Sequence, residues 1–221
     1  MVIRALIFDF DGLLMDTETT LLDSWRHEWR RHGLELDEST FFADHGGDMS
    51  EHRYAVLAGA VGPGFDRAAS HARRIAYREG LHEGLGLAAG ITAWFGEAER
   101  LGLRLAVASS SVRSWVAGNL ARTGDLDRFE VLACGDEVTA YKPDPAVYRL
   151  ALDRLGLPPE QALAFEDSPH GVAAAHAAGL RCVAIPNPFT DAARYARADL
   201  VLPTAAAVNL TEVLERCAAT G

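Results

Sequence analysis

The amino-acid sequence predicts an α/β protein, a doubly wound parallel sheet with a helical block inserted after its first strand. The chain opens on a nearly continuous apolar run, residues 2–8, which suits a strand covered on both faces. In residues 84–221, short apolar runs alternate with amphipathic stretches of helical length, which is the pattern of βαβ units. Between these regions the sequence carries amphipathic stretches without a convincing strand, which indicates the inserted block.

After the insertion, strands and helices are expected to follow one another regularly. Gly102, Gly124, Gly156 and Gly179 stand at or near the ends of predicted helices, as C-terminal stop signals do. The predicted strands are residues 103–108, 129–134, 162–165, 181–185 and, as a short edge strand, 199–202. The predicted helices of this region are residues 91–101, 112–122, 145–155, 169–178 and 209–218.

The insertion divides the chain into two predicted domains. Residues 1–15 and 84–221 form the core that contains the sheet, and residues 16–83 form the helical block. Because ligands bind at the carboxyl ends of parallel strands, a block inserted there is placed to cover the site and exclude water. The predicted helices of the block are residues 19–32, 37–44, 50–60 and 66–80.

Asp9-Phe10-Asp11-Gly12 is the most informative short motif, because it falls at the carboxyl end of the first predicted strand. In open α/β sheets, ligands bind at this end. Two carboxylates this close repel each other unless a cation or a shared proton relieves them, and Gly12 allows the backbone to turn sharply. The motif therefore predicts a cation site or an acid–base site.

Lys142 is the single lysine among the twenty-one Lys and Arg residues of the chain, and it lies in Tyr141-Lys142-Pro143-Asp144-Pro145. Arginine is planar and wide, whereas lysine delivers a compact point charge on a flexible stem. A chain that uses arginine for every other positive charge is expected to keep a lysine where only the compact charge serves. The alternative is an accident of strong arginine bias.

Composition restricts the partners and the compartment. The formal net charge of −10 argues against a nucleic-acid partner. No apolar run approaches the roughly twenty residues of a membrane-spanning helix, and no secretory leader precedes the first strand. Cys134, Cys182 and Cys217 are far apart and lack metal-ligand spacing, as buried thiols of a reducing compartment do. We expect a cytoplasmic protein, a monomer or weak homo-oligomer, without membrane or nucleic-acid partners.

Four motifs occur in chain order and together span the sequence. They are Asp9-Phe10-Asp11-Gly12 with Asp16-Thr17-Glu18, then Ser109, Lys142, and Glu166-Asp167-Ser168. Through these four motifs the chain resembles the haloacid dehalogenase superfamily, and within it the branch with a helical cap, near β-phosphoglucomutase and the small phosphosugar phosphatases. The resemblance implies a Rossmann-like core with an inserted helical cap.

The resemblance also implies Mg²⁺-dependent phosphoryl transfer, with a role for each matched residue. Asp9 is implied as the nucleophile that forms an aspartyl-phosphate, and Asp11 as the acid, then the base that activates water. Ser109 and Lys142 are implied to hold the phosphoryl oxygens with help from Ser110, although the serines also suit a helix cap. The implied metal residues are Asp9, Asp167, Asp11 through its backbone carbonyl, and Glu166 through metal-bound water.

Within the cap, the residues expected to bind substrate are Gly47, in His45-Gly46-Gly47-Asp48, and Arg53, because related caps carry a specificity loop there. The alternative is that Arg53 is an ordinary exposed arginine on a helix, without a role in substrate binding. Trp25 and Trp29 are expected to pack the interior of the cap.

Three functions are compared on this basis. The expected one is a phosphatase of a small phosphorylated metabolite, a sugar or polyol phosphate. The alternative is a sugar-phosphate mutase of the β-phosphoglucomutase type, in which a histidine at the position of Leu21 holds the acid/base idle. With leucine there, Asp11 is expected to swing freely and activate water. The mutase's cap lysine is also absent, leaving Arg73 or Arg74 to replace its charge. A non-catalytic metabolite-binding regulator is disfavoured because the nucleophile and acid are both kept.

Overall fold

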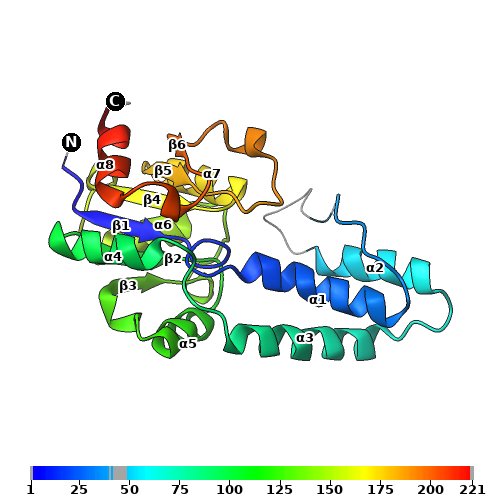
Figure 1. Cartoon of the computed structure of the whole chain (residues 1–221). Coiled ribbons are helices and arrows are strands. Elements are labelled where there is room, and N and C mark those ends of the chain that lie inside the picture. Colours follow the sequence, from blue (N-terminus) through cyan, green and yellow to red (C-terminus); the bar gives the residue numbers. More distant parts are fainter. Residues whose placement is uncertain (1, 40, 42–48, 220–221) are drawn as a thin grey trace. The chain divides into compact units, whose positions relative to one another are not determined.

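The computed structural model describes residues 2–39, 41 and 49–219, and the chain divides into two compact units. One unit, the core, consists of Met1–Met15 and Gly86–Gly221, and the other, the cap, of Asp16–Leu85. Figure 1 shows the helices and strands of both units. Each unit has its own hydrophobic interior.

The core is built on a six-stranded sheet in which all strands are parallel, in the order β3-β2-β1-β4-β5-β6. This arrangement confirms the predicted doubly wound sheet, and β6 lies at its edge as expected. Because the chain leaves β1 toward β2 and later returns on the other side as β4, the switch point lies between β1 and β4. The strands are β1 (Ala5–Phe8), β2 (Arg104–Ala108), β3 (Phe129–Ala133), β4 (Ala162–Glu166), β5 (Arg181–Ala184) and β6 (Leu200–Val201).

Alternate residues of the central strand enter two different layers, because side chains of a strand point to opposite faces. Ile7 belongs to the cluster that contains the apolar residues of the α6 and α7 helices. Phe8 points the other way, stacking on Phe165 at a ring-centroid distance of 4.8 Å and meeting the edge of Phe95 on α4 at 5.8 Å. The core helices are α4 (Ile91–Arg100), α5 (Arg113–Thr123), α6 (Ala146–Leu155), α7 (Pro169–Ala177) and α8 (Leu210–Ala219).

The predicted core elements agree with the observed ones to within one residue at each end, except that β1 begins at Ala5, three residues after the start of the apolar run at residues 2–8. Gly102, Gly124, Gly156 and Gly179 all have positive φ, between 62° and 87°, which explains why the helices stop there. Short 3₁₀ turns complete the core, at Leu126–Arg128, Gly135–Glu137, Pro159–Gln161, Ala192–Tyr195 and Ala205–Ala207.

The cap contains three described helices, α1 (Thr17–Arg31), α2 (Ser50–Val61) and α3 (Arg67–Glu83). Trp25 is fully buried and Trp29 nearly so, and both pack in the cap cluster as predicted. Leu21 packs against the same cluster.

The helix predicted at residues 37–44 is wrong for the part that the structure describes. Residues 37–39 and 41 are not helical, and residues 42–44 lie outside the described residues. Asp37 Oδ1 accepts hydrogen bonds from the backbone N–H and the hydroxyl of Ser39. This local turn competes with helix formation, because the side chain offers the backbone an alternative partner.

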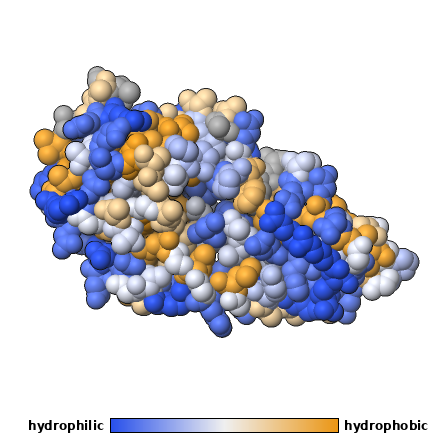
Figure 2. Space-filling model, viewed as in Figure 1, coloured by the Kyte–Doolittle hydropathy of each residue, from blue (hydrophilic) through white to orange (hydrophobic). Residues whose placement is uncertain are grey.

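On the face shown in Figure 2, hydrophilic residues predominate and apolar residues are scattered among them. Within the described part of the chain, none of the helices is both long and apolar enough to cross a membrane. Cys134, Cys182 and Cys217 are all buried, and none of the three forms a disulfide.

Candidate active site

The carboxyl ends of β1 and β4 place the acidic motifs side by side. Phe8 pairs with Phe165 in the parallel register, so Asp9 follows β1 at the level where β4 ends in Glu166. The backbone N–H of Asp9 donates to the carbonyl of Phe165 at 2.9 Å, which extends the pairing past the strand. Asp167 follows immediately and is only 2% exposed. The two motifs therefore meet at the switch point of the sheet, the usual place for a ligand.

Lys142 links the two motifs through its ammonium group. Its Nζ lies 2.5 Å from Asp9 Oδ1, 2.6 Å from Glu166 Oε1 and 2.8 Å from the carbonyl oxygen of Ala108, the last residue of β2. Three acceptors use the three ammonium protons, and the side chain is only 6% exposed. The structure therefore brings the single lysine to Asp9.

The charges of this cluster do not balance. Burial raises the pKa of Asp9 well above its ordinary value, and the carboxylates of Glu166 and Asp167 add to this rise against the opposing effect of Lys142. Burial favours the neutral amine of Lys142, but the carboxylates of Asp9 and Glu166 outweigh burial and raise its pKa. Lys142 is thus a fixed cation, and one positive charge faces three carboxylates. The excess negative charge is a physical reason for a bound cation.

The acidic cluster provides ligands of the right chemistry for such a cation. Ligand atoms of Asp9, Glu166 and Asp167 all lie within 4.8 Å of one another, and all three residues are buried. A set made only of carboxylate oxygens suits a hard cation such as Mg²⁺, which keeps water or substrate oxygens in its remaining positions. The residues present therefore fit a magnesium ion.

Glu166 has a second set of partners that the sequence did not indicate. Tyr148, fully buried on α6, donates its hydroxyl to Glu166 Oε1 at 2.6 Å. Its ring also lies beneath the ammonium of Lys142, with Nζ 5.0 Å from the ring centroid. Burial raises the pKa of Tyr148 well above its ordinary value, so the hydroxyl stays a donor. Tyr148 therefore orients Glu166 through its hydroxyl group and faces the ammonium group of Lys142 with its ring.

Gly171 gives Glu166 the space that it needs. A Cβ atom added to Gly171 would lie 1.9 Å from Cδ and Oε2 of Glu166 and 2.0 Å from its Oε1. Gly171 sits in the first turn of α7, whose N-terminus is capped by the hydroxyl of Ser168. The approach of a helix backbone to a buried carboxylate explains a glycine that looks like an ordinary helix residue in the sequence.

Asp11 points to a different set of partners. Its Oδ2 accepts a hydrogen bond from Ser111 Oγ at 2.6 Å, and its Oδ1 accepts one from Trp115 Nε1 at 3.0 Å. The backbone turn after Asp11 requires Gly12, which has a φ of 84°. Two donors from the α5 region therefore hold the carboxylate of Asp11 here, a contact that the apolar Leu21 gave no reason to expect.

The serines after β2 do not cap α5, whose N-cap residue is Val112 and lacks a side-chain cap hydrogen bond. Ser109 is 1% exposed, and its hydroxyl oxygen accepts from the backbone N–H of Ser111 at 3.0 Å, so its own proton can be donated elsewhere. Ser110 is exposed in the same loop. Ser109 and Ser110 thus lie at the carboxyl edge of the sheet next to the strand that carries Asp9.

The predicted cap residues belong to the other unit. Arg53, on α2, donates to the carbonyl of Phe41 at 2.9 Å and lies over the ring of Phe41 at 4.1 Å. Gly47 lies outside the described residues. Arg73 pairs with the buried Glu28 at 2.6 Å. Arg74, 3% exposed, donates to Tyr54 and Ser24. Both arginines are therefore engaged inside the cap.

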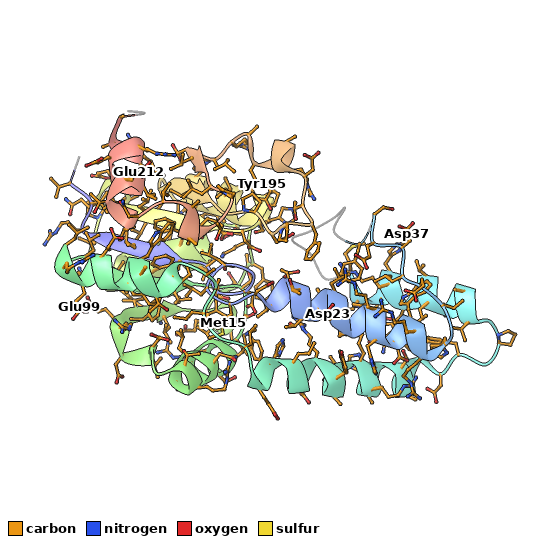
Figure 3. The ribbon with its side chains drawn as sticks, viewed as in Figure 1. Met15, Asp23, Asp37, Glu99, Tyr195 and Glu212 are labelled. Atoms are coloured by element: carbon orange, nitrogen blue, oxygen red, sulfur yellow. The ribbon has the colours of Figure 1, made fainter. Side chains whose placement is uncertain are left out.

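Tyr195, labelled in Figure 3, lies at the end of the 3₁₀ turn Ala192–Tyr195, which follows β5 in the chain. It is fully buried and donates its hydroxyl to the backbone carbonyl of Asp167. This bond fixes the main chain that carries Asp167, and sequence alone gave no sign of it because the two residues lie in different βα units.

Comparisons with known proteins agree with this arrangement. The sequence model of the haloacid dehalogenase-like hydrolases matches residues 6–185. Protein CbbY of Rhodobacter capsulatus is 38% identical over 230 residues, covering 97% of this chain and 99% of the relative. Fructose-1-phosphate phosphatase YqaB of Escherichia coli (strain K12) is 30% identical over 182 residues, covering 81% of this chain and 94% of the relative.

Among solved structures, a CbbY mutant from Rhodobacter sphaeroides in complex with xylulose-(1,5)bisphosphate has a TM-score of 0.72 and 31% identity. The match covers 95% of this chain and 98% of that chain. The resemblance drawn from the four motifs is thereby confirmed. The chain belongs to the haloacid dehalogenase-like hydrolases, and within them to the enzymes that hydrolyse phosphoric monoesters.

Proposed function

We propose that the protein is a Mg²⁺-dependent phosphatase of a small sugar or polyol phosphate that works through an aspartyl-phosphate on Asp9. The observation that carries this proposal is the position of Lys142 Nζ, within 2.6 Å of both Asp9 and Glu166, whose ligand atoms cluster with those of Asp167. A carboxylate nucleophile with a fixed cation next to it and an acidic cluster behind it is the arrangement that phosphoryl transfer requires.

In the first half of the reaction, a free carboxylate oxygen of Asp9 attacks phosphorus, and the bond from phosphorus to the leaving oxygen breaks. Asp11 delivers a proton to that oxygen. In the second half, Asp11 removes a proton from water, which attacks phosphorus and releases Asp9 with inorganic phosphate. Throughout, Lys142 and Ser109 stabilise the negative charge on the phosphoryl oxygens that do not react.

The metal residues in this proposal are Asp9, Asp167 and the backbone carbonyl of Asp11, with Glu166 toward metal-bound water. When bound, Mg²⁺ supplies positive charge that lets Asp9 and the phosphoryl group approach each other. Glu166 is restricted to a supporting role in this scheme because one of its oxygens is already engaged by Lys142 and Tyr148.

The class of substrate is proposed from the names of relatives. One is named a fructose-1-phosphate phosphatase, and the CbbY structure holds xylulose-(1,5)bisphosphate. Both compounds are phosphorylated sugars, so a sugar or polyol phosphate is the substrate class that we propose for this chain.

One structural observation favours the phosphatase over the mutase. Arg73 and Arg74 are held by Glu28, Tyr54 and Ser24 inside the cap, which argues against either one replacing the mutase's cap lysine. A cytoplasmic location, supported by three buried cysteines that form no disulfide, and a monomeric or weakly associating state complete the proposal.

The test is release of inorganic phosphate from a panel of sugar, polyol and nucleotide phosphates and phosphoglycolate, with Mg²⁺ and with EDTA. We expect activity on sugar or polyol phosphates, loss of activity in EDTA and none for Asp9→Asn, which keeps the shape of the side chain. Activity confined to another class would overturn the substrate assignment. Activity retained by Asp9→Asn above about a hundredth of wild type would overturn the role of Asp9, because losing a nucleophile costs several orders of magnitude.

A further inference from the structure

We propose that Ser111 and Trp115 form a latch that holds the carboxylate of Asp11 in a resting position, and that its release sets the rate of acid–base catalysis. This inference rests on the proposed function, because it assumes that Asp11 is the acid and base. Ser111 and Trp115 are positioning residues here, acting only through Asp11.

The latch occupies both oxygens of one carboxylate. Ser111 Oγ lies 2.6 Å from Oδ2 of Asp11, and Trp115 Nε1 lies 3.0 Å from Oδ1. Ser111 lies just before α5 and Trp115 lies in its first turn, so both donors come from one short segment of the chain. Hydrogen bonds to a charged acceptor are stronger than neutral ones, and two of them fix the orientation of the carboxylate as well as its position.

The donors themselves are anchored, so Asp11 is the partner that must move. The backbone of Ser111 is held at both ends, since its N–H donates to Ser109 Oγ at 3.0 Å and its carbonyl accepts from Gly135 at 2.8 Å. Gly135 also packs closely against this loop, because a Cβ there would lie 2.0 Å from the carbonyl oxygen of Ser110. On the helix side, the carbonyl of Trp115 accepts from Asn119 at 2.9 Å.

Asp11 lies on the more adaptable side of the contact. It is half-buried, in the loop after β1, and is followed by Gly12. Its side chain is also absent from the acidic cluster formed by Asp9, Glu166 and Asp167. An acid or base acts within hydrogen-bond distance of the reacting oxygen. Asp11 must therefore exchange its bonds with the latch for a bond to the leaving oxygen or to water.

This exchange predicts the direction of the effect of each latch residue. Removing one donor weakens the resting position without touching Asp9, Lys142 or the metal residues. A hydrogen bond to a charged group shifts the balance between held and released Asp11 by about ten- to a hundredfold. Trp115→Phe, which keeps the ring and loses the N–H, should therefore speed hydrolysis of the aspartyl-phosphate by about tenfold, and Ser111→Ala should do the same.

The first measurement tests the contact without using activity. The indole N–H resonance of Trp115 is assigned in ¹⁵N-labelled protein by its disappearance in Trp115→Phe. We expect it to move in Asp11→Ala, while that of Trp94, which donates to the carbonyl of Val208 at 3.0 Å, stays in place. With Mg²⁺ and trifluoroberyllate, a mimic of phosphorylated Asp9, it should move toward its position in Asp11→Ala. A Trp115 resonance that ignores Asp11→Ala would overturn the latch.

The second measurement tests the role of the contact. The protein is phosphorylated with acetyl phosphate, and the decay of the aspartyl-phosphate is followed in wild type, Trp115→Phe, Ser111→Ala and the control Ser114→Ala, an exposed residue of α5. Faster decay in both latch variants and unchanged decay in the control supports the latch. Equal or slower decay overturns the latch. Equal decay would mean that the bonds from Ser111 and Trp115 have no effect on catalysis, and slower decay would mean that they hold Asp11 in its catalytic position. A wild type that never forms a phospho-enzyme overturns the proposed function instead, and the indole resonance distinguishes this from failure of the contact.

Discussion

Gly171→Ala is expected to damage both stability and activity, although it adds only one methyl group to a helix. The new Cβ would lie 1.9 Å from Cδ of Glu166, well inside any allowed contact. Glu166 cannot yield freely, because it is fully buried and bonded to Lys142 and Tyr148. The methyl group must therefore displace the carboxylate, and Lys142 loses one of its two anionic partners.

The magnitude follows from two opposing effects. Alanine is favoured over glycine in a helix by about 1 kcal/mol. Displacing Glu166 loses its bonds to Lys142 and Tyr148, each worth about 1.5–3 kcal/mol as a hydrogen bond to a charged group. The steric effect wins, and the free energy of unfolding should fall by about 2–5 kcal/mol. For a chain of this size, this corresponds to a fall in Tm of roughly 4–20 °C.

The assay is urea and thermal unfolding together with kcat/KM on the best substrate of the panel. Gly118→Ala is the matched control, because Gly118 is exposed on α5 and a Cβ there would have nothing within 4 Å. The control should keep activity and gain up to about 1 kcal/mol of stability. If Gly171→Ala were as stable as the control and kept wild-type kcat/KM, the packing of Gly171 against Glu166 would be refuted.

Three further changes test the neighbours of Glu166. Lys142→Arg keeps the charge, but the wide guanidinium cannot place a single nitrogen between Asp9, Glu166 and the carbonyl of Ala108. The fall in kcat/KM should correspond to a loss of about 2–4 kcal/mol of transition-state stabilisation. Near-normal kinetics would show that lysine is not required. Tyr148→Phe keeps the ring beneath Lys142 and removes the hydrogen bond to Glu166. The free energy of unfolding should therefore fall by about 1.5–3 kcal/mol, and kcat should fall more than KM rises. An unchanged free energy of unfolding contradicts the role of the hydroxyl. Because burial raises the pKa of Asp9 in the folded state, its contribution to stability is present below the ordinary aspartate pKa and is lost as pH rises through the raised value. In EDTA, the urea midpoint of Asp9→Asn should therefore increase relative to that of wild type as pH rises, and added Mg²⁺ should reduce this difference. A difference in midpoint that does not depend on pH contradicts the raised pKa of Asp9.

The sequence was most informative about features that depend on position along the chain. Strand ends, helix-stopping glycines and the four motifs are local signals, and Asp9, Lys142 and Glu166 meet because parallel strands end at the same edge. Asp37 shows the limit of local reasoning, since its turn with Ser39 replaces a helix that the amphipathic pattern predicted.

The residues that the sequence did not reveal act through distant contacts. Trp115 meets Asp11 across 104 positions of the chain, and Tyr148 reads as an ordinary core aromatic of α6. Gly171 has no positive φ to mark it, and only the approach of Glu166 explains it. Such contacts depend on how helices pack on the sheet, which periodicity does not specify. The apolar Leu21 suggested that Asp11 lacks a hydrogen-bond partner, because the sequence does not show that Ser111 and Trp115 lie close enough to bond to it.

The central claim, a covalent phosphoryl group on Asp9, is tested most directly by trapping. Wild type is mixed with Mg²⁺ and its best substrate, quenched in acid during steady-state turnover and reduced with borohydride, which converts an acyl phosphate to homoserine. Peptide mass spectrometry then reads positions 9 and 11 separately. We predict homoserine at position 9 alone, formed only with substrate and Mg²⁺. Turnover that leaves Asp9 unmodified, or homoserine at position 11, would contradict the assignment of Asp9 as the nucleophile.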